Sequence, residues 1–277
     1  MTSKIAAVAN LAFHVFRAHS LRSMARRTDA YSENSNSNGI RRLCASSLTN
    51  TSEPESLEEV SSDALKTLLT NVSALTLEDV GVDRVHGFDS SSFSAPVIYV
   101  HITENEIFSM GMFILRPGSR IPLHSHPGMF GIIRVMQGAV RCQSFTRLST
   151  SQLRAAGGPL AVLSAQGAAK WQLSDFTVAQ PHQDTLLNVG CEPCVLTPHT
   201  GNLHELTAVD GTVVFLDILA PPYNHDLGAR ECLFYREVAM PMVTADPATS
   251  SFVYLVETHQ PKDYWCETAP YRGPSVS

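Results

Sequence analysis

A mainly β protein with a short helical region on its N-terminal side is the fold class that this sequence predicts. Short runs rich in β-branched and aromatic residues recur from residue 97 onward, and Pro-Gly and Gln-Gly pairs, which favour turns, separate the first of these runs. Ahead of them, apolar residues recur at intervals of three and four, which is the period of a helix. Many short strands at such spacing are typical of a β-sandwich or barrel.

The first 50 residues differ in composition from the rest of the chain. They carry seven basic and two acidic side chains, a balance of +5, so a total net charge of −6 leaves −11 for the remainder. The first 27 residues contain no acid, and residues 41–46 resemble the Arg-x-Leu-x-x-Ser pattern of processing sites; both are features of a mitochondrial presequence. The alternative is a disordered basic tail. We therefore expect residues 1–50 to be a targeting or disordered segment, in a mitochondrial or cytoplasmic protein.

Residues 54–75 predict one amphipathic helix, or two short helices with a break between Val60 and Leu65. Early acidic residues suit the N-terminal end of a helix dipole. The apolar positions that give the helical period are Leu57, Val60, Leu65, Leu68, Leu69, Val72 and Leu75. We expect this region to pack on a larger body.

The β region begins near residue 96. The first expected strands cover residues 97–102, 107–115, 131–136 and 139–145, and later ones cover 185–189, 206–209, 212–219 and 252–256. Residues 148–183 are less regular and read as a long excursion from the sheet. With 44% hydrophobic and 17% charged residues, the composition is that of a globular protein rather than a disordered one.

Several functional classes are disfavoured by composition. No run approaches the roughly 20 apolar residues of a membrane span, so we expect no membrane association. An acidic body is a poor partner for nucleic acid, which requires clustered Lys and Arg. Six cysteines over this length do not form a disulfide framework, and the isolated Cys191-x-x-Cys194 pair is a weak metal motif.

Three histidines carry the strongest chemical signal. In an extended strand alternate side chains share a face, so His124 and His126 project the same way from Cα atoms about 7 Å apart. Imidazoles so placed can close on one metal ion, with His204 as a third ligand from another strand. The pattern indicates a metal-dependent enzyme rather than a binding scaffold.

The spacing around these histidines resembles the two motifs of the cupins. Gly118, five further residues, His124-x-His126 and then Gly138 fit the first motif, and residues 198–204 fit the second more loosely. The glutamate that usually follows the second histidine is absent. Three neutral imidazoles leave a divalent ion with its full charge, which favours an anionic ligand from outside the protein, and a thiolate suits the softer transition metals.

Longer stretches resemble one family specifically, the 2-aminoethanethiol dioxygenases and plant cysteine oxidases. These stretches are residues 121–129, 196–204, 215–223, 263–266 and 270–274, within a resemblance that spans roughly residues 55–275. The resemblance implies a cupin-like double-stranded β-helix, or jelly-roll barrel, and a cupin thiol dioxygenase domain over residues 51–277.

The resemblance also implies an activity. Members of this family are Fe(II) enzymes that add both atoms of O2 to a thiol and produce a sulfinic acid. Their substrates are cysteamine and peptides with an N-terminal cysteine, and in the latter role they sense oxygen for N-degron turnover. By motif, the iron ligands of this chain would be His124, His126 and His204.

Asp217 aligns with a residue of the family pocket, and it also interrupts the apolar run 213–219. A carboxylate in such a run is costly unless it is paired. A substrate ammonium group is one candidate partner. The alternative is an ion pair within the protein, with Arg120, Arg134 or Arg141.

Tyr223 and Cys232 are further candidates near this pocket. Tyr223 could donate a hydrogen bond to oxygen or substrate at the iron, or it could be a packing aromatic. In the animal enzymes a cysteine at the position of Cys232 can crosslink to a tyrosine two residues later, but here that residue is Phe234. Because consecutive strand residues point to opposite faces, Tyr235 is a poor substitute, and we expect no crosslink.

Two other functions remain open at this point. One is a cupin metalloenzyme that acts on a non-thiol substrate, and the other is a non-catalytic metal-binding cupin. Three ligands without a fourth protein donor disfavour the latter, because structural zinc is normally closed by four. In the absence of a coiled coil or an obvious interface segment, we expect a monomer.

Overall fold

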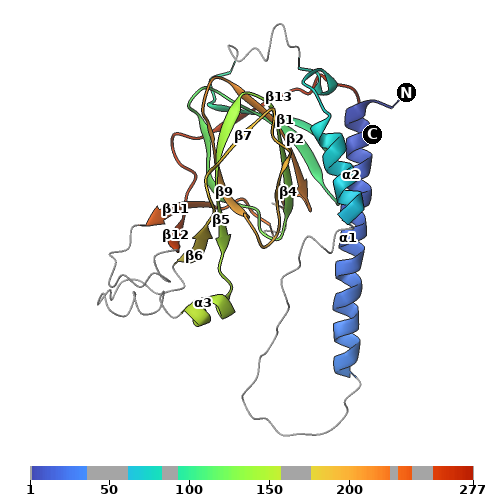
Figure 1. The fold of residues 1–277 in the computed structure, drawn as a ribbon, viewed down its shortest axis with the longest axis vertical. Helices are drawn as coiled ribbons and strands as arrows, with labels where there is room; N and C mark the ends of the chain where they lie inside the picture. The colour runs from blue at the N-terminus through green and yellow to red at the C-terminus, as the bar shows by residue number, and fades with distance from the viewer. Residues whose placement is uncertain are drawn as a thin grey trace.

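A computed structural model describes residues 2–35, 62–82, 93–156, 176–224, 230–238 and 252–276. Its centre is a barrel of two facing β-sheets, with two helices along one side (Figure 1). This is the double-stranded β-helix expected from the sequence, and the prediction of a mainly β fold is confirmed.

One sheet of the barrel has the order β13-β1-β2-β10-β4-β8, with every neighbouring pair antiparallel except β1 and β13. Its strands are β1 (Val97–Glu104), β2 (Ser109–Leu115), β4 (Phe130–Gln137), β8 (Cys194–Leu196), β10 (Val213–Ala220) and β13 (Cys266–Ala269).

The second sheet has the order β6-β12-β11-β3-β9-β5-β7 and is antiparallel throughout. Its strands are β3 (Arg120–Ser125), β5 (Ala139–Arg147), β6 (Thr177–Pro181), β7 (Thr185–Asn188), β9 (Leu203–Ala208), β11 (Phe234–Val238) and β12 (Val253–Thr258). The excursion expected over residues 148–183 contains α3 (Thr150–Ala156) and the sheet strand β6, and its residues 157–175 lie outside the described part.

The strands of the first sheet are apolar on both faces because both faces are buried. Toward the barrel interior, Phe215 and Ile133 pack with Leu206 and Val140 of the other sheet. Toward the outside, a second core cluster joins this sheet to the helices. This double burial explains the nearly uninterrupted apolar sequence of β10, in which Asp217 is the exception.

Helix α2 (Ser62–Ser73) confirms the amphipathic pattern of residues 54–75 in its C-terminal part, and residues 54–61 lie outside the described part. A short 3-10 helix, η2 (Glu78–Val80), follows it. Leu68 and Val72 of α2 are fully buried in the outer core cluster.

Helix α1 (Lys4–Ser35) is the main departure from the expectation for residues 1–50. Over the described residues 2–35 the chain is not a disordered tail, because Ile5, Val8, Ala12 and Phe16 form an apolar face that lies buried in the outer core cluster. The Lys4 ammonium also pairs with Asp79 of η2 at 3.1 Å. Residues 36–50 lie outside the described part, and the targeting role stays a prediction.

Among the described residues, no helix is both long enough and apolar enough to cross a membrane.

The packing of α1 predicts a measurable contribution to stability. The Ile5→Ala change removes a fully buried side chain, so we expect the free energy of unfolding to fall by about 2–4 kcal/mol in a denaturant titration. Leu21→Ala on the same helix is the control: its side chain is 58% exposed, and the change should cost less than about 0.5 kcal/mol. Equal costs for the two variants would contradict the packing of α1 against the barrel.

Candidate metal centre

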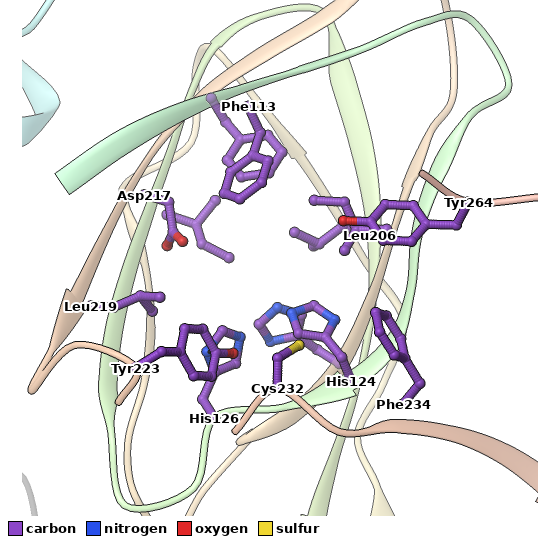
Figure 2. Close-up of a pocket in the computed structure, with 14 residues that line it drawn as sticks. Phe113, His124, His126, Leu206, Asp217, Leu219, Tyr223, Cys232, Phe234 and Tyr264 are labelled. Carbon is purple, nitrogen blue, oxygen red and sulfur yellow. The ribbon is translucent and has the colours of Figure 1, made fainter. Parts of the chain in front are cut away.

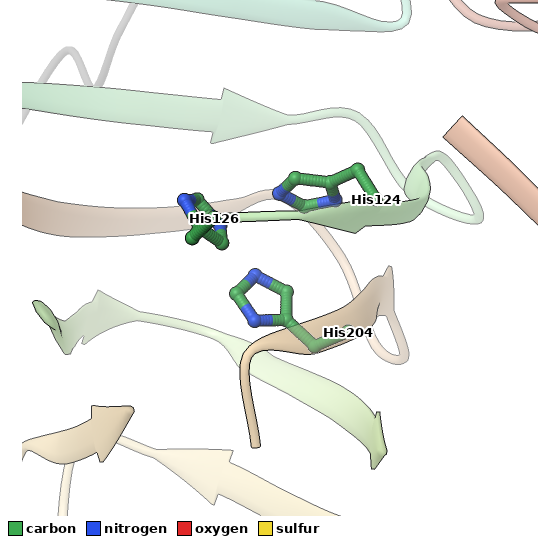
Figure 3. Close-up of side chains that lie close together, drawn as sticks. All are labelled: His124, His126 and His204. Atoms are coloured by element: carbon green, nitrogen blue, oxygen red, sulfur yellow. The ribbon is translucent and has the colours of Figure 1, made fainter. Parts of the chain in front are cut away.

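The three histidines expected as ligands meet at one point inside the barrel (Figure 3). His124 lies on β3, His126 directly follows that strand, and His204 on β9 is the cross-strand partner of His124. One potential ligand nitrogen from each ring lies within 4.8 Å of the others, and each side chain is at most 6% exposed. Pairing of β3 with β9 thus brings together His124 and His204, which are 80 positions apart in the sequence.

Hydrogen bonds fix the orientation of each ring. The Nδ1 atom of His124 lies 2.8 Å from the Pro122 carbonyl oxygen, and the His204 ring is hydrogen-bonded to the backbone of Gly201. A histidine that donates Nδ1–H to a carbonyl keeps its Nε2 lone pair for a metal. The His124 contact therefore favours the tautomer that binds metal through Nε2.

The environment of His126 tests most directly whether these residues fit a metal. Its Nδ1 lies 2.7 Å from the Tyr223 hydroxyl, which itself lies 2.9 Å from the Ser125 carbonyl oxygen. If the hydroxyl donates to that carbonyl, its oxygen accepts the His126 Nδ1–H. The opposite nitrogen, Nε2, is buried and has no hydrogen-bond partner among the described residues. Buried polar atoms are normally satisfied, so a metal ion fits this position.

Burial also sets the protonation of the ligands. It lowers the pKa of His124 to about 4, although hydrogen bonds to the backbone oppose the shift. Burial, followed by repulsion from neighbouring histidines, holds the pKa values of His126 and His204 well below the ordinary range. All three rings are therefore neutral near pH 7, which is the form that binds a metal.

Asn202, which was not singled out from the sequence, holds the ligand loops together. Its side-chain amide donates to the backbone carbonyls of His126 and of Thr197, the latter at 3.1 Å. The backbone amide of His126 in turn donates to the Asn202 carbonyl at 3.1 Å. The signal in the sequence is its place after Gly201, whose φ of 65° turns the chain into β9.

A pocket opens from the three histidines into the barrel (Figure 2). It contains about 470 Å³ of empty space, including its opening to solvent. Apolar side chains form most of its wall: Phe113, Ile121, Ile133, Leu206, Phe215, Leu219 and Phe234. Asp217, Tyr223, Cys232 and Tyr264 are the other residues around it.

Asp217 lies in this wall, as its position in the apolar run of β10 suggested. None of the three arginines considered as partners pairs with it. Arg120 binds Glu205 and Asp263, Arg134 donates to backbone carbonyls, and Arg141 lies 4.0 Å from Asp184. Burial raises the pKa of Asp217 to about 7. The pocket therefore holds a carboxylate that is available to a cationic ligand.

Tyr223 contacts the metal ligands through His126, as described above, and its phenol ring lies 5.5 Å from the imidazole. The tyrosine therefore orients a ligand of the metal site. Donation from its hydroxyl to substrate or oxygen stays a prediction.

Cys232 lies in the pocket in hydrogen-bond contact with the Tyr223 hydroxyl. Burial raises the pKa of its thiol to about 11, so it stays protonated near pH 7 and is a poor metal ligand. Phe234 faces the pocket, whereas Tyr235 is buried on the other face of β11 and accepts a hydrogen bond from Arg147 at 3.1 Å. Tyr235 is thus turned away from Cys232, and the absence of a crosslink stays a prediction.

The C-terminal segment, in which residues 263–266 resemble a stretch of the family, also contributes to the pocket through Tyr264. Arg120 on β3 forms ion pairs with Glu205 at 2.6 Å and with Asp263 at 3.1 Å. The second pair fixes the residue that precedes Tyr264, and the Tyr264 ring lies in the pocket wall 5.7 Å from Phe234. The ion pairs therefore hold the end of the chain against the mouth of the barrel.

The orientation of His126 gives a prediction for metal affinity. Tyr223→Phe removes the hydroxyl that contacts Nδ1 of His126 but keeps the ring, so we expect metal affinity to fall roughly 10–100-fold in a chelator competition. Tyr235→Phe is the matched control, since it removes a buried hydroxyl from the opposite face of the strand. An unchanged affinity in a folded Tyr223→Phe protein would show that the contact does not orient the ligand.

Comparison with known proteins identifies relatives over most of the chain. The PCO_ADO family matches residues 68–276. The chain is 38% identical to 2-aminoethanethiol dioxygenase of Mus musculus over 229 residues, which cover 76% of this chain and 83% of the relative. It is 40% identical to the Homo sapiens enzyme of the same name, with coverages of 65% and 68%. Plant cysteine oxidase 1 of Arabidopsis thaliana is 29% identical, with coverages of 78% and 73%.

Proposed function

Because this chain belongs to the PCO_ADO family, we propose that it is an Fe(II)-dependent thiol dioxygenase that converts the thiol of cysteamine, or of an N-terminal cysteine, to a sulfinic acid. The observation that carries this proposal is a single pocket that joins three neutral imidazoles to the carboxyl group of Asp217. Such a pocket offers two different sites to a molecule that has a thiolate and an ammonium group close together.

The donor set fits iron, because imidazole nitrogen binds iron as it binds other transition metals. His124, His126 and His204 would hold it through nitrogen atoms, and among the described residues no carboxylate or thiol belongs to the ligand cluster. Three neutral ligands leave the positive charge of a divalent ion uncompensated, which favours an anionic thiolate from the substrate. When bound, the iron supplies the redox chemistry between O2 and sulfur.

The other residues bind and orient the substrate. Asp217 in its carboxylate form would pair with the substrate ammonium in a wall that is otherwise apolar, where such pairs are strong. Phe113, Phe215 and Leu206 would limit the entry of water. Tyr223 would keep His126 in its ligand orientation.

Cysteamine and peptides with an N-terminal cysteine share the amino-thiol group that this pocket would recognise. In both, two carbon atoms separate the sulfur from the nitrogen, so the same pair of sites would serve either. A role in oxygen sensing, through N-degron substrates, follows from the second class. The names of the plant relatives support that class, and the names of the animal relatives support the first.

The cellular location and the oligomeric state remain proposals. The acid-poor, Arg-containing N-terminus supports a mitochondrial location, with the cytoplasm as the alternative. Removal of residues 1–50 as a presequence would also remove α1, whose apolar face belongs to the core. We keep a monomer as the expected state.

The activity itself is tested with the full-length protein loaded with Fe(II) in air. Incubation with cysteamine, and separately with a peptide that begins with cysteine, should add the mass of two oxygen atoms to at least one of them in mass spectrometry. The control is His204→Ala, which should abolish the gain because it removes a ligand. No gain on either thiol, with iron shown to be bound, would reject the proposal and favour a cupin enzyme that acts on carbon.

The role of Asp217 predicts a distinct pH dependence. Since burial raises its pKa to about 7, the carboxylate form increases as pH rises through 7, and kcat/KM for cysteamine should rise over the same range. Asp217→Asn keeps the shape without the charge, so we expect KM to rise about tenfold or more and this pH step to disappear.

Two controls distinguish a loss of amine recognition from a general loss of activity in the Asp217→Asn variant. Ethanethiol lacks the amine, so its slow oxidation should be the same in the wild type and in Asp217→Asn. Asp210→Asn, at an exposed position, should leave cysteamine kinetics unchanged. An equal loss of activity on both thiols would contradict an ammonium site at Asp217.

A further inference from the structure

Tyr99 packs against the aromatic residues of the pocket wall, although it is not itself one of the residues that line the pocket. Its ring lies 5.0 Å from that of Phe113, its cross-strand partner on β2, and Phe113 stacks on Phe215 at 5.3 Å. Phe113 and Phe215 both line the pocket. Since cross-strand partners share a face of the sheet, Tyr99 lies on the interior side of β1.

The absence of a side chain at Gly111 makes room for the Tyr99 phenol. A Cβ atom at Gly111 would lie 2.4 Å from Cε2 of Tyr99 and 2.5 Å from its hydroxyl oxygen. Two non-bonded atoms cannot approach so closely. The phenol end of Tyr99 therefore occupies the place that a side chain of residue 111 would take.

That place lies directly opposite Asp217. Gly111 on β2 is the cross-strand partner of Asp217 on β10. Cβ atoms of such partners lie about 4.5–5.5 Å apart on the same face of a sheet. By filling the place of the missing side chain, the Tyr99 hydroxyl lies on the same face of the sheet as the Asp217 side chain and beside it. These two described side chains are not hydrogen-bonded in this structure, so a hydrogen bond between them would form as the Asp217 carboxyl group ionises. In agreement, burial and then the charge of Asp217 raise the pKa of Tyr99.

We propose that Tyr99 is a positioning residue for substrate recognition, in which its hydroxyl orients the Asp217 carboxylate toward the amine of the substrate and favours its ionised form. This inference rests on the proposed function. A phenol is protonated at neutral pH and can donate, and a hydrogen bond to a carboxylate stabilises the charged form. Gly111 has a role in the same arrangement, because any larger residue would displace the phenol.

Other titratable groups surround this pair. Glu104 and Cys266 contribute to the electrostatic environment of Tyr99, and Asp217 contributes to that of Tyr223. His101, which is exposed, is the cross-strand partner of Gly111 on the side away from Asp217. Burial opposes ionisation of the Asp217 carboxyl group, whereas donation from Tyr99 would favour it. The balance decides how much of Asp217 is charged near pH 7.

The first test is Tyr99→Phe, which keeps the ring and its contact with Phe113 but removes the hydroxyl. At pH 7 we expect kcat/KM for cysteamine to fall about fivefold, mainly through KM, because a smaller fraction of Asp217 is ionised. The acid limb of the pH profile should move to higher pH by about one unit, so the deficit should narrow above pH 8.5. Tyr254→Phe, on β12 in a separate cluster with Leu148 and Val178, is the control and should behave as the wild type.

The second test does not depend on turnover. A 13C-carboxyl NMR titration of the full chain loaded with diamagnetic Zn(II), with the Asp217 signal assigned by its loss in Asp217→Asn, measures the ionisation directly. The midpoint should be higher in Tyr99→Phe than in the wild type and in Tyr254→Phe. An identical midpoint in a variant of unchanged thermal stability would overturn the proposal. A wild type that fails to oxidise thiols would instead reject the proposed function and leave this titration valid.

Discussion

The structure depends above all on the burial of three imidazole rings around one point. Neutral imidazole nitrogens are costly to bury unless they are hydrogen-bonded or bound to a metal. Nδ1 of His124 lies against the Pro122 carbonyl and Nδ1 of His126 against the Tyr223 hydroxyl. The Nε2 atom of His126 has no hydrogen-bond partner among the described residues. A metal ion would satisfy it, and the pairing of β3 with β9 and the contacts of Asn202 hold the ligands in place for that ion.

The first sheet of the barrel has two buried faces with different roles. The outer face of the first sheet is sealed by α1 and α2, and its inner face forms the wall that carries Asp217. Ionisation of a carboxyl group is unfavourable in a strand whose two faces are both buried, and the raised pKa of Asp217 reflects this. Such a group is useful where a ligand brings the opposite charge, and the neighbouring Tyr99 lies where it can moderate the cost.

Sequence reasoning identified the parts of the site that have a local pattern. Strand geometry predicts that the side chains of His124 and His126 point to the same face. Asp217 stands out as a charged residue within an apolar run. The contact of Tyr223 with His126, and the place of Tyr99 over Gly111, depend on strand pairing across the barrel and have no local signature. The basic, acid-poor composition of residues 1–27 predicts a presequence, and composition alone does not show that apolar side chains of α1 pack in the core.

The central claim, that an open three-histidine site accepts the substrate thiolate, is tested most directly by X-ray absorption at the iron K-edge. Iron-loaded full-length protein is measured without oxygen, before and after addition of cysteamine. We expect only nitrogen and oxygen neighbours before addition, and one sulfur neighbour afterwards. An iron environment that contains sulfur without substrate, or one that gains none with saturating cysteamine, would contradict this account.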